Sequence, residues 1–380
     1  MFDPAFIRML TEAVGEDRAR TVLDGLDGTP SVSVRLNPAR LRECPFPGAE
    51  RVPWSPYGYW LQERPAFTMD PLFHAGCYYV QDSSAMFVGE LFRRVLPRFA
   101  APVSVLDLCA APGGKTTDLA ASLREAFGER FSLVANEVMK KRFSVLRANV
   151  RTWGDPRVGM TSLDPAAFGK WPLFDIIVAD VPCSGEGMFR KDDKAVEDWS
   201  EETVAFCAAR AKRILSDVWP ALRPGGVLVY STCTFNRLEN DDTVAWIAAE
   251  LGAEVLDFGD IPPVVKTDCG YALLPGFVPG EGQYAAALVK DGVPSGRPVR
   301  GDVLDRTERP VTPDPGYPRF DIDRDTALRY LHGDALSLPD APKGLLTLCF
   351  EGHPLGPAKN LGTRCNNLYP KENRIRKQIP

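Results

Sequence analysis

Residues 103–117 read VSVLDLCAAPGGKTT, and this stretch decides the fold. A short apolar, β-branched run ends in Asp107 and is followed by a loop with two adjacent glycines, which leads into a helical sequence. Glycines in such a loop let the backbone approach a ligand closely, and the free amides at the start of a helix bind polar or anionic groups. The stretch therefore predicts a strand, a ligand-binding loop and a helix.

The same alternation of strands and helices extends from about residue 100 to residue 290. Continuous apolar strands between amphipathic helices predict a parallel sheet covered on both faces, which is an open α/β domain. In such a sheet, ligands bind beyond the carboxyl ends of the strands. We expect strands at Val103–Asp107, Phe131–Asn136, Phe174–Asp180 and Gly226–Cys233, and helices at 115–125, 138–152, 200–219 and 238–251.

Length and composition limit the class of protein. A chain of 380 residues predicts two or three domains, and 44% hydrophobic with 25% charged residues excludes a disordered chain. The net charge of −5 means that any basic surface is local. Nine cysteines without a CxxC pair disfavour a zinc ribbon or a disulfide framework. Because neither a signal peptide nor a long apolar run is present, we expect a cytoplasmic protein without a membrane segment.

The region before the α/β domain, residues 1–99, predicts an α+β extension. Loosely periodic apolar residues predict one helix over the first 25 residues, and an alternating pattern predicts a short strand at 31–35. Residues 44–71 are rich in Pro and aromatic residues, which is typical of an irregular packed connector.

The region after the α/β domain predicts a linker and a further domain. Residues 291–318 are rich in Pro and lack periodicity, as linkers do. In the domain that follows, residues 319–380, Leu345–Phe350 predicts a strand. The last part, residues 359–380, carries six basic residues against the single acid Glu372, so a local basic surface is expected there.

The loop after the first strand contains Gly-Lys-Thr, but it is not a phosphate-binding P-loop. The P-loop spacing GxxxxGK[ST] requires Gly where Cys109 stands. Glu137 ends the second strand, and an acid at that position bonds ribose hydroxyls in nucleotide-binding sheets. Because the fingerprint GxGxxG is absent, we predict a ribose-bearing cofactor other than a dinucleotide.

Two cysteines follow two further strands. Cys183 lies in DVPCSGEGMFRKD, which begins at Asp180, and Cys233 lies in YSTCTFN, which begins at Tyr230. A single cysteine is more often a small buried hydrophobic residue than a reactive one. Two thiols at the same edge of one sheet, beside a carboxylate, indicate chemistry.

These motifs resemble the Sun/Fmu (NOP/Sun) family of S-adenosylmethionine-dependent RNA 5-methylcytosine methyltransferases. SVRLNP at 33–38 and DPLFHAGCYYVQDSS at 70–84 are similar to the N-terminal signatures of the family. GPAK at 356–359 with NNLYPK at 366–371 resembles the PUA-like domain of the RsmF-like bacterial branch, which methylates small-subunit ribosomal RNA near the decoding site. The resemblance implies a Rossmann-like methyltransferase sheet with an RNA-binding N-terminal extension and a C-terminal PUA-like domain. It also implies S-adenosyl-L-methionine as cofactor and ribosomal RNA as partner, with no metal and no DNA.

The resemblance assigns roles to individual residues. It implies that Cys233 attacks cytosine C6, that Cys183 assists loss of the C5 proton and release, and that Asp180 bonds the N3/N4 edge of the base. Lys115 is expected between cofactor and base. The family commonly has Asn two residues before Asp164, the expected adenine contact, and Ser162 stands there in this chain. The implied cofactor residues are Cys109, Ala110, Ala111, Pro112, Gly113, Gly114, Lys115, Glu137 for the ribose, Asp164 and Asp180.

Other residues are candidates for RNA contact. Basic candidates lie in the Cys183 loop and in the tail, and aromatic side chains could stack on an extruded base. His74 is expected to be structural, and a solvated surface is the simpler interpretation of the tail alone. A ribosome-assembly factor with dispensable catalysis remains an alternative function, whereas DNA cytosine methylation is disfavoured by the second thiol motif and the tail. The candidates are Arg190, Lys191, Lys371, Arg374, Arg376 and Lys377 for phosphates, and Tyr78, Tyr79 and Phe189 for bases.

Overall fold

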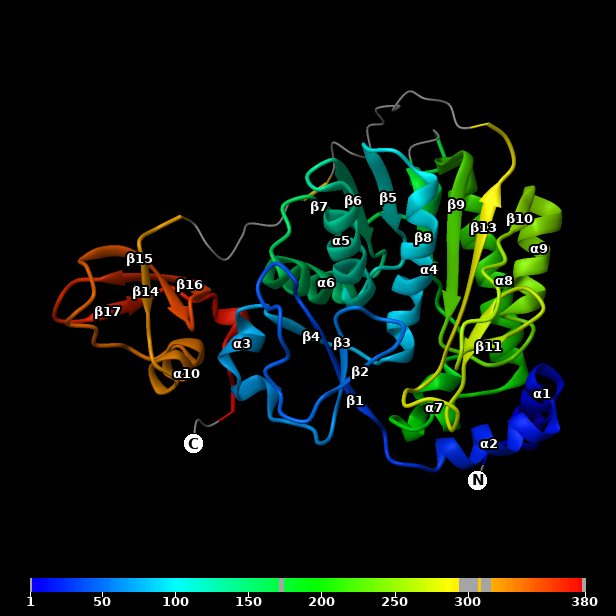
Figure 1. Ribbon diagram of the computed structural model, residues 1–380, viewed down its shortest axis with the longest axis horizontal. Helices are drawn as coiled ribbons and strands as arrows, with labels where there is room; N and C mark the ends of the chain where they lie inside the picture. Colours follow the sequence, from blue (N-terminus) through cyan, green and yellow to red (C-terminus); the bar gives the residue numbers. More distant parts are fainter. Residues whose placement is uncertain (1, 171–173, 294–306, 309–315, 378–380) are drawn as a thin grey trace.

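The structure is a computed structural model that describes residues 2–170, 174–293, 307–308 and 316–377. Figure 1 shows a large α/β domain, an N-terminal extension packed against it, and a C-terminal domain that projects to one side. The predicted linker at 291–318 lies largely outside the described residues, since 294–306 and 309–315 are not described.

The central sheet has the strand order β11-β12-β13-β9-β8-β5-β6-β7, and β10 pairs with β13. The strands from β9 to β7 are parallel, and β13 runs antiparallel to β9. Because the chain goes from β5 outward to β7 and then crosses to β8, the strand order reverses between β5 and β8. The bounds are β5 (Val103–Asp107), β6 (Phe131–Asn136), β7 (Val158–Thr161), β8 (Phe174–Asp180), β9 (Leu222–Thr232), β10 (Ala253–Val255), β11 (Val265–Lys266), β12 (Tyr271–Leu273) and β13 (Gln283–Lys290).

Three of the four predicted strands have the predicted bounds, and the fourth, β9, begins four residues early and ends one residue early. Its first half contains Pro224 and two glycines, residue types that disfavour the prediction of a strand from sequence. The predicted parallel sheet is present, and β10 to β13 add an antiparallel edge that was not predicted. The Ala-rich sequence of β13 has low strand propensity and gave no signal.

Helices cover both faces of the sheet, as predicted. Successive strand residues point to opposite faces, so Leu106 and Ile177 pack with α1, α2, α8 and α9, whereas Val105 and Ile176 pack with α4, α5 and α6. In the described part of the chain, none of the helices has the length and apolar character that crossing a bilayer requires. The helices are α4 (Phe87–Val95), which was not predicted, α5 (Gly114–Phe127), α6 (Lys140–Trp153), the short α7 (Asp193–Glu197), α8 (Glu201–Val218) and α9 (Asp241–Leu251).

The N-terminal extension begins with two helices instead of the single predicted one. Gly15 has φ 84°, a conformation that L side chains rarely adopt, and it separates α1 from α2. Four short strands follow in the order β2-β3-β1-β4, so the predicted irregular connector contains β2 and β3. The bounds are α1 (Pro4–Val14), α2 (Glu16–Leu26), β1 (Val32–Leu36), β2 (Glu50–Arg51), β3 (Gly58–Leu61), α3 (Pro71–His74) and β4 (Tyr78–Val80).

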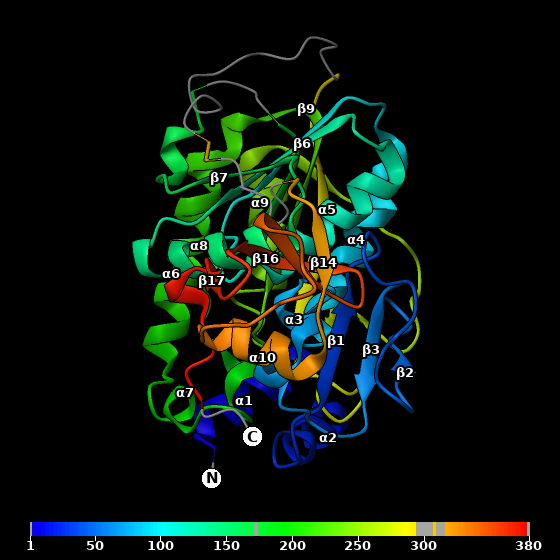
Figure 2. The ribbon, with the colours of Figure 1, turned by 90° about the vertical axis from the view of Figure 1, so that its left-hand side faces the viewer.

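The C-terminal domain is a four-stranded sheet in the order β14-β15-β16-β17 with one helix. Its core is continuous with that of the extension, since Leu331 and Leu348 belong to the same cluster as Val34 and Tyr78. Figure 2 shows this domain in front of the central sheet. The bounds are β14 (Arg319–Asp321), α10 (Arg324–His332), β15 (Gly344–Phe350), β16 (His353–Asn360) and β17 (Cys365–Asn367).

Candidate active site

The two thiols meet beyond the ends of neighbouring strands. Cys183 follows β8 and Cys233 follows β9, and Asp180 and Ser231 are partners in the parallel pairing of these strands. The two Sγ atoms lie 3.3 Å apart, at hydrogen-bonding distance. This contact, together with burial, raises the pKa of Cys183 well above its ordinary value. The two loops that carry them, residues 181–189 and 233–240, are called the thiol loops below.

A lysine–carboxylate pair lies at the same edge of the sheet. Lys115 Nζ donates to Asp180 Oδ2 at 2.9 Å, while Ser231 Oγ and Gln283 Nε2 donate to Asp180 Oδ1 at 2.7 and 3.1 Å. Burial opposes the charge of Lys115, but Asp180 outweighs it and the pKa of Lys115 is raised. Asp180 thus has one fixed orientation. Gln283 was missed by sequence reasoning because it lies on the unpredicted strand β13.

The loop between β5 and α5 presents backbone groups beside this pair. Gly113 has φ 110°, and α5 begins without a side-chain cap, so its first amides are open to a ligand. Asp107 is fully buried at the end of β5; Thr116 Oγ1 donates to its Oδ2 at 2.6 Å, and its Oδ1 has no hydrogen-bond partner. Burial raises the pKa of Asp107 to about 7. Burial likewise raises the pKa of Cys109, which suits a small packing residue more than a nucleophile.

The two acids expected at the cofactor differ in their surroundings. Glu137 is 2% exposed. Its Oε1 accepts from the amide of Met139 at 2.9 Å, while its Oε2 lies 3.4 Å from Arg142 without a hydrogen bond. Asp164 is exposed, and its side chain accepts from the amide of Ala166 at 3.1 Å to cap a short 3-10 helix. Asp107 Oδ1 and Glu137 Oε2, which accept no hydrogen bond, and the open amides of α5 fit a cofactor with hydroxyl and amino groups. The adenine contact of Asp164 stays a prediction.

Two buried glutamates tie the thiol loops to each other. Glu186 accepts from the amides of Phe235 and Asn236 at 2.6 and 3.1 Å, and Glu239 accepts from the amide of Ser184 at 3.0 Å. Each carboxylate therefore comes from one thiol loop and binds the other. The Asn236 side chain donates to both, at 2.9 and 2.8 Å. Burial raises the pKa of Glu239 to about 7. These three residues, Glu186, Asn236 and Glu239, are called the glutamate cluster.

Two of the expected RNA contacts are wrong. The Arg190 side chain is 9% exposed; it pairs with Glu281 at 2.7 Å and donates to the carbonyls of Gly25 and Gly280 at 2.9 and 2.6 Å. Phe189 is buried in the core beside α1, with its ring 5.0 Å from that of Phe6. Residues 187–191 (GMFRK) therefore anchor their loop through the side chains of Phe189 and Arg190, which do not face RNA.

The remaining candidates for RNA contact differ in how deeply their side chains are buried. Lys191 is partly exposed and pairs with Glu281 and Asp82 at 3.2 and 3.6 Å. Tyr78 is buried and donates to Asp70 at 2.6 Å, whereas Tyr79 is half-buried. His74 contacts the carbonyl of Thr68 at 3.0 Å, as a structural histidine does. In the tail, Lys371, Arg376 and Lys377 are exposed and Arg374 is half-buried.

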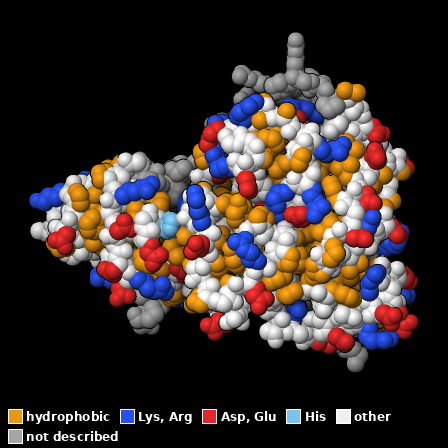
Figure 3. Space-filling model, in the orientation of Figure 1, with side chains coloured by type: hydrophobic (Ala, Val, Ile, Leu, Met, Phe, Trp, Pro, Cys, Tyr) orange, Lys and Arg blue, Asp and Glu red, His pale blue; other side chains and the backbone are white. Residues whose placement is uncertain are grey.

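The visible surface carries no large block of one charge. Figure 3 shows Lys and Arg intermixed with Asp and Glu over this face, in keeping with the net charge of −5. Among the described residues, no group of three or more His, Cys, Asp or Glu side chains is arranged to hold a metal ion.

Comparison with known proteins gives the same family over each part of the chain. The sequence model of the family 16S rRNA methyltransferase RsmB/F matches residues 100–288. The family model of the N-terminal domain of 16S rRNA methyltransferase RsmF matches residues 2–83, and that of the methyltransferase RsmF PUA domain matches residues 317–375. The chain belongs to the RsmB/F family of 16S rRNA methyltransferases. The resemblance seen in the motifs and the predicted fold class are thereby confirmed.

Curated relatives of the chain include proteins named ribosomal RNA small subunit methyltransferase F from two bacteria. The protein of Klebsiella pneumoniae is 40% identical over 220 residues, which are 55% of this chain and 44% of the relative. That of Pectobacterium atrosepticum is 35% identical over 257 residues, 64% of this chain and 51% of the relative. The chain spans about half the length of the curated relatives it matches.

Solved structures share the fold of this RsmB/F chain. A methyltransferase homolog from Pyrococcus horikoshii has a TM-score of 0.62 at 24% identity, covering 76% of this chain and 99% of its own. NSun6 from the same organism, solved with SFG, has a TM-score of 0.63 at 18% identity, covering 77% and 99%. At these identities the likeness shows the fold alone.

Proposed function

We propose that the chain methylates cytosine C5 in RNA, with S-adenosylmethionine as methyl donor and 16S ribosomal RNA near the decoding region as substrate. One observation carries the proposal: two thiols lie 3.3 Å apart beside the Lys115–Asp180 pair. An amino or hydroxyl acceptor already has a lone pair for the methyl group, whereas cytosine C5 gains nucleophilic character only after a nucleophile adds to C6. A thiol is therefore required for C5 and superfluous for other acceptors.

The chain's own residues divide the reaction between them. By resemblance to the family, Cys233 is the attacking sulfur and Cys183 is the thiol that assists release, and the 3.3 Å between the two Sγ atoms lets both act on one base. Attack at C6 makes C5 an enamine carbon, and the Lys115–Asp180 pair stabilises charge that develops on the ring. After the methyl group is on C5, that carbon loses its proton with the help of Cys183, and the bond between C6 and the Cys233 sulfur then breaks.

The cofactor would lie along the β5–α5 loop. S-adenosylmethionine supplies an electrophilic methyl group on a sulfonium when it is bound. Residues 109–115 would hold its methionine part, Glu137 its ribose and Asp164 its adenine, and Asp180 would also contact it. The Asp107 and Glu137 oxygens that accept no hydrogen bond support this assignment, as does a fold neighbour solved with SFG, an analogue of S-adenosylmethionine.

A denaturing gel tests the division of roles between the thiols. Cys183→Ala and Cys233→Ala are incubated with S-adenosylmethionine and under-methylated cellular RNA, and the gel reports protein retarded by covalently attached RNA. We expect an adduct with Cys183→Ala, which can attack but not release, and none with Cys233→Ala. Cys269→Ala is the matched control, since this half-buried thiol lies outside the site. An adduct with Cys233→Ala alone would reverse the roles, and none with either would favour the RNA-binding assembly factor.

A further inference from the structure

The family motif SVRLNP has no role in the proposed chemistry, yet it carries a fully buried arginine. Arg35 lies in β1 with 0% exposure, and its guanidinium stands 4.8 Å from the centre of the Trp153 ring. Burial lowers the pKa of Arg35, although the negative charge of Asp118 acts in the opposite direction. Because burying a guanidinium is unfavourable unless acceptors surround it, its acceptors indicate what it holds in place.

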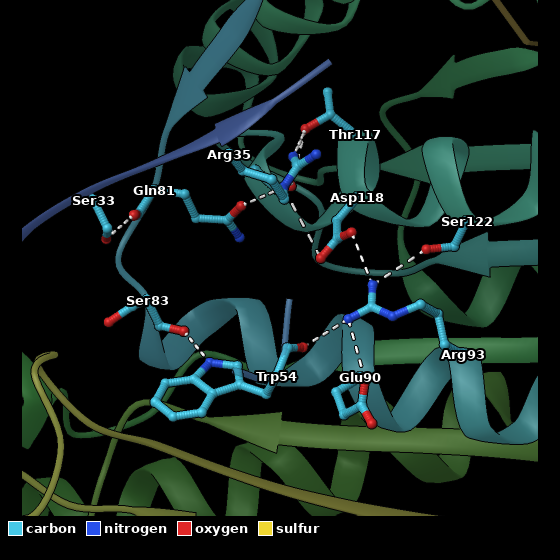
Figure 4. Close-up of polar contacts among 11 residues, drawn as sticks. Ser33, Arg35, Trp54, Gln81, Ser83, Glu90, Arg93, Thr117, Asp118 and Ser122 are labelled. Carbon is cyan, nitrogen blue, oxygen red and sulfur yellow. Dashed lines mark hydrogen bonds and ion pairs between the residues drawn. The ribbon is translucent and has the colours of Figure 1, made fainter. Parts of the chain in front are cut away.

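The acceptors of Arg35 belong to two different parts of the chain. Its Nε donates to Gln81 Oε1 at 2.9 Å within the N-terminal extension. Its Nη2 donates to the carbonyl of Gly114 at 2.9 Å and to Thr117 Oγ1 at 2.5 Å, both on the first turn of α5. Figure 4 shows Arg35 reaching from β1 towards Thr117 and Asp118, whose Oδ2 is 3.9 Å away.

This turn is the end of the loop that we assign to the cofactor. Gly114 directly precedes Lys115, whose amine pairs with Asp180. A Cβ on Gly114 would lie 3.1 Å from the Tyr79 ring, so the extension also packs closely against the loop. Asn149 adds a third link, because its Nδ2 donates to the Tyr79 hydroxyl at 3.3 Å and to the carbonyl of Pro112 at 2.8 Å.

We propose that Arg35 is a positioning residue for the cofactor loop. By holding the Gly114 carbonyl, it joins the extension and the loop into one rigid unit, so that affinity for the cofactor depends on the extension. A lysine cannot replace it, because the function requires the planar fork that reaches Gln81 and Gly114 at once. The dependence of cofactor affinity rests on the proposed function, whereas the rigidity of the loop does not.

Arg35→Met is compared with a matched control, Arg93→Met. Arg93 also pairs with Asp118, at 3.2 Å, and also binds the extension, through the carbonyl of Trp54 at 2.9 Å. Its described contacts include no residue of the loop at 109–115. Two readouts are used: amide hydrogen exchange of residues 109–117 without ligand, and calorimetric binding of S-adenosylhomocysteine.

We expect Arg35→Met to speed exchange in the loop and to weaken S-adenosylhomocysteine about tenfold, the factor that one hydrogen bond to a charged group represents. Arg35→Lys should behave like Arg35→Met. Arg93→Met should lower the melting temperature but leave loop exchange and binding at the wild-type values. Equal effects of Arg35→Met and Arg93→Met on the loop, or wild-type exchange in Arg35→Met, would overturn the proposal.

A milder variant keeps the test decisive if Arg35→Met does not fold. Gln81→Leu removes the acceptor that orients Nε and leaves the guanidinium in place. It should speed amide hydrogen exchange at residues 109–117, as Arg35→Met does. Unchanged exchange would count against the positioning role of Arg35. A wild-type protein that does not bind S-adenosylhomocysteine would contradict the proposed function, while the exchange comparison would still judge the role of Arg35.

Discussion

Two buried polar clusters flank the candidate site, and they neutralise their charge in different ways. Behind the cofactor loop, the arginine cluster of Arg35, Arg93 and Asp118 sets cations against an anion (Figure 4). Under the thiol loops, Glu186 and Glu239 are both acidic, and all the hydrogen bonds that the structure describes to them come from neutral donors.

The difference shows two ways to bury charge near one active site. In the arginine cluster the attraction between opposite charges offsets the free-energy cost of removing them from water. The cluster therefore depends on the presence of both the cations and the anion. In the glutamate cluster a proton takes that role, because burial raises the pKa of Glu239 to about 7. The first cluster should therefore be sensitive to mutation, and the second to pH.

The largest effect is expected from Asp118→Ala, which removes the anion of the arginine cluster. Asp118 is 1% exposed, and its loss leaves the buried Arg35 without a carboxylate and Arg93 with Glu90 alone, 3.5 Å away. Breaking a buried pair in this way costs about 3 to 5 kcal/mol of unfolding free energy, measurable by chemical denaturation. Glu125→Ala on the same helix is the control; this exposed acid should contribute less than about 1 kcal/mol. Equal losses would mean that Arg35 does not need its carboxylate.

A smaller effect is expected from pH acting on the glutamate cluster. Glu239 has a folded pKa of about 7 against an ordinary value of 4.5, so between these values the folded state binds more protons than the unfolded state. Stability is therefore lost as pH rises from about 4.5 to 7, by up to about 3 kcal/mol from this group. Glu239→Gln should flatten the profile of unfolding free energy against pH.

Other buried acids contribute to the same profile. Burial raises the pKa of Asp107 to about 7 and also raises the pKa of Asp82, so part of the slope should remain in Glu239→Gln. Arg93→Met is the matched control, because it lowers stability without changing a raised carboxyl pKa and should keep the full slope. If Glu239→Gln kept the wild-type slope, the glutamate cluster would not be the pH-sensitive one.

Both clusters also show where sequence reasoning ends. The β5–α5 loop and both thiol motifs could be predicted because strand ends in a parallel sheet share one edge, and the structure places Lys115, Asp180, Cys183 and Cys233 together there. Arg35, in contrast, lies 79 positions from Gly114 along the chain, and the sequence offers no sign that the two touch. Such contacts depend on tertiary packing, not on local pattern.

The same limit explains the two wrong predictions at Phe189 and Arg190, at the end of the loop that carries Cys183. Arg190 and Phe189 occur in a Gly-rich, basic segment that is typical of a nucleic-acid contact. Their environment is set by α1, α2 and Glu281, which are distant in sequence. Gln283 was missed for the opposite reason: its polar character at a strand end was informative, but the Ala-rich strand itself gave no signal.

The smallest effect on stability is expected in the tail, whose described residues make no hydrogen bond or ion pair with either cluster. Lys371, Arg376 and Lys377 are exposed, so Lys→Gln or Arg→Gln there should change the unfolding free energy by no more than about 0.5 kcal/mol. If they meet phosphates of single-stranded RNA, each substitution should reduce the slope of log affinity against log salt by about 0.7. Arg213→Gln on α8 is the exposed control. An unchanged slope in the triple variant would remove the tail from the RNA interface, whereas a reduced slope at wild-type stability would separate RNA affinity from the two clusters that hold the site.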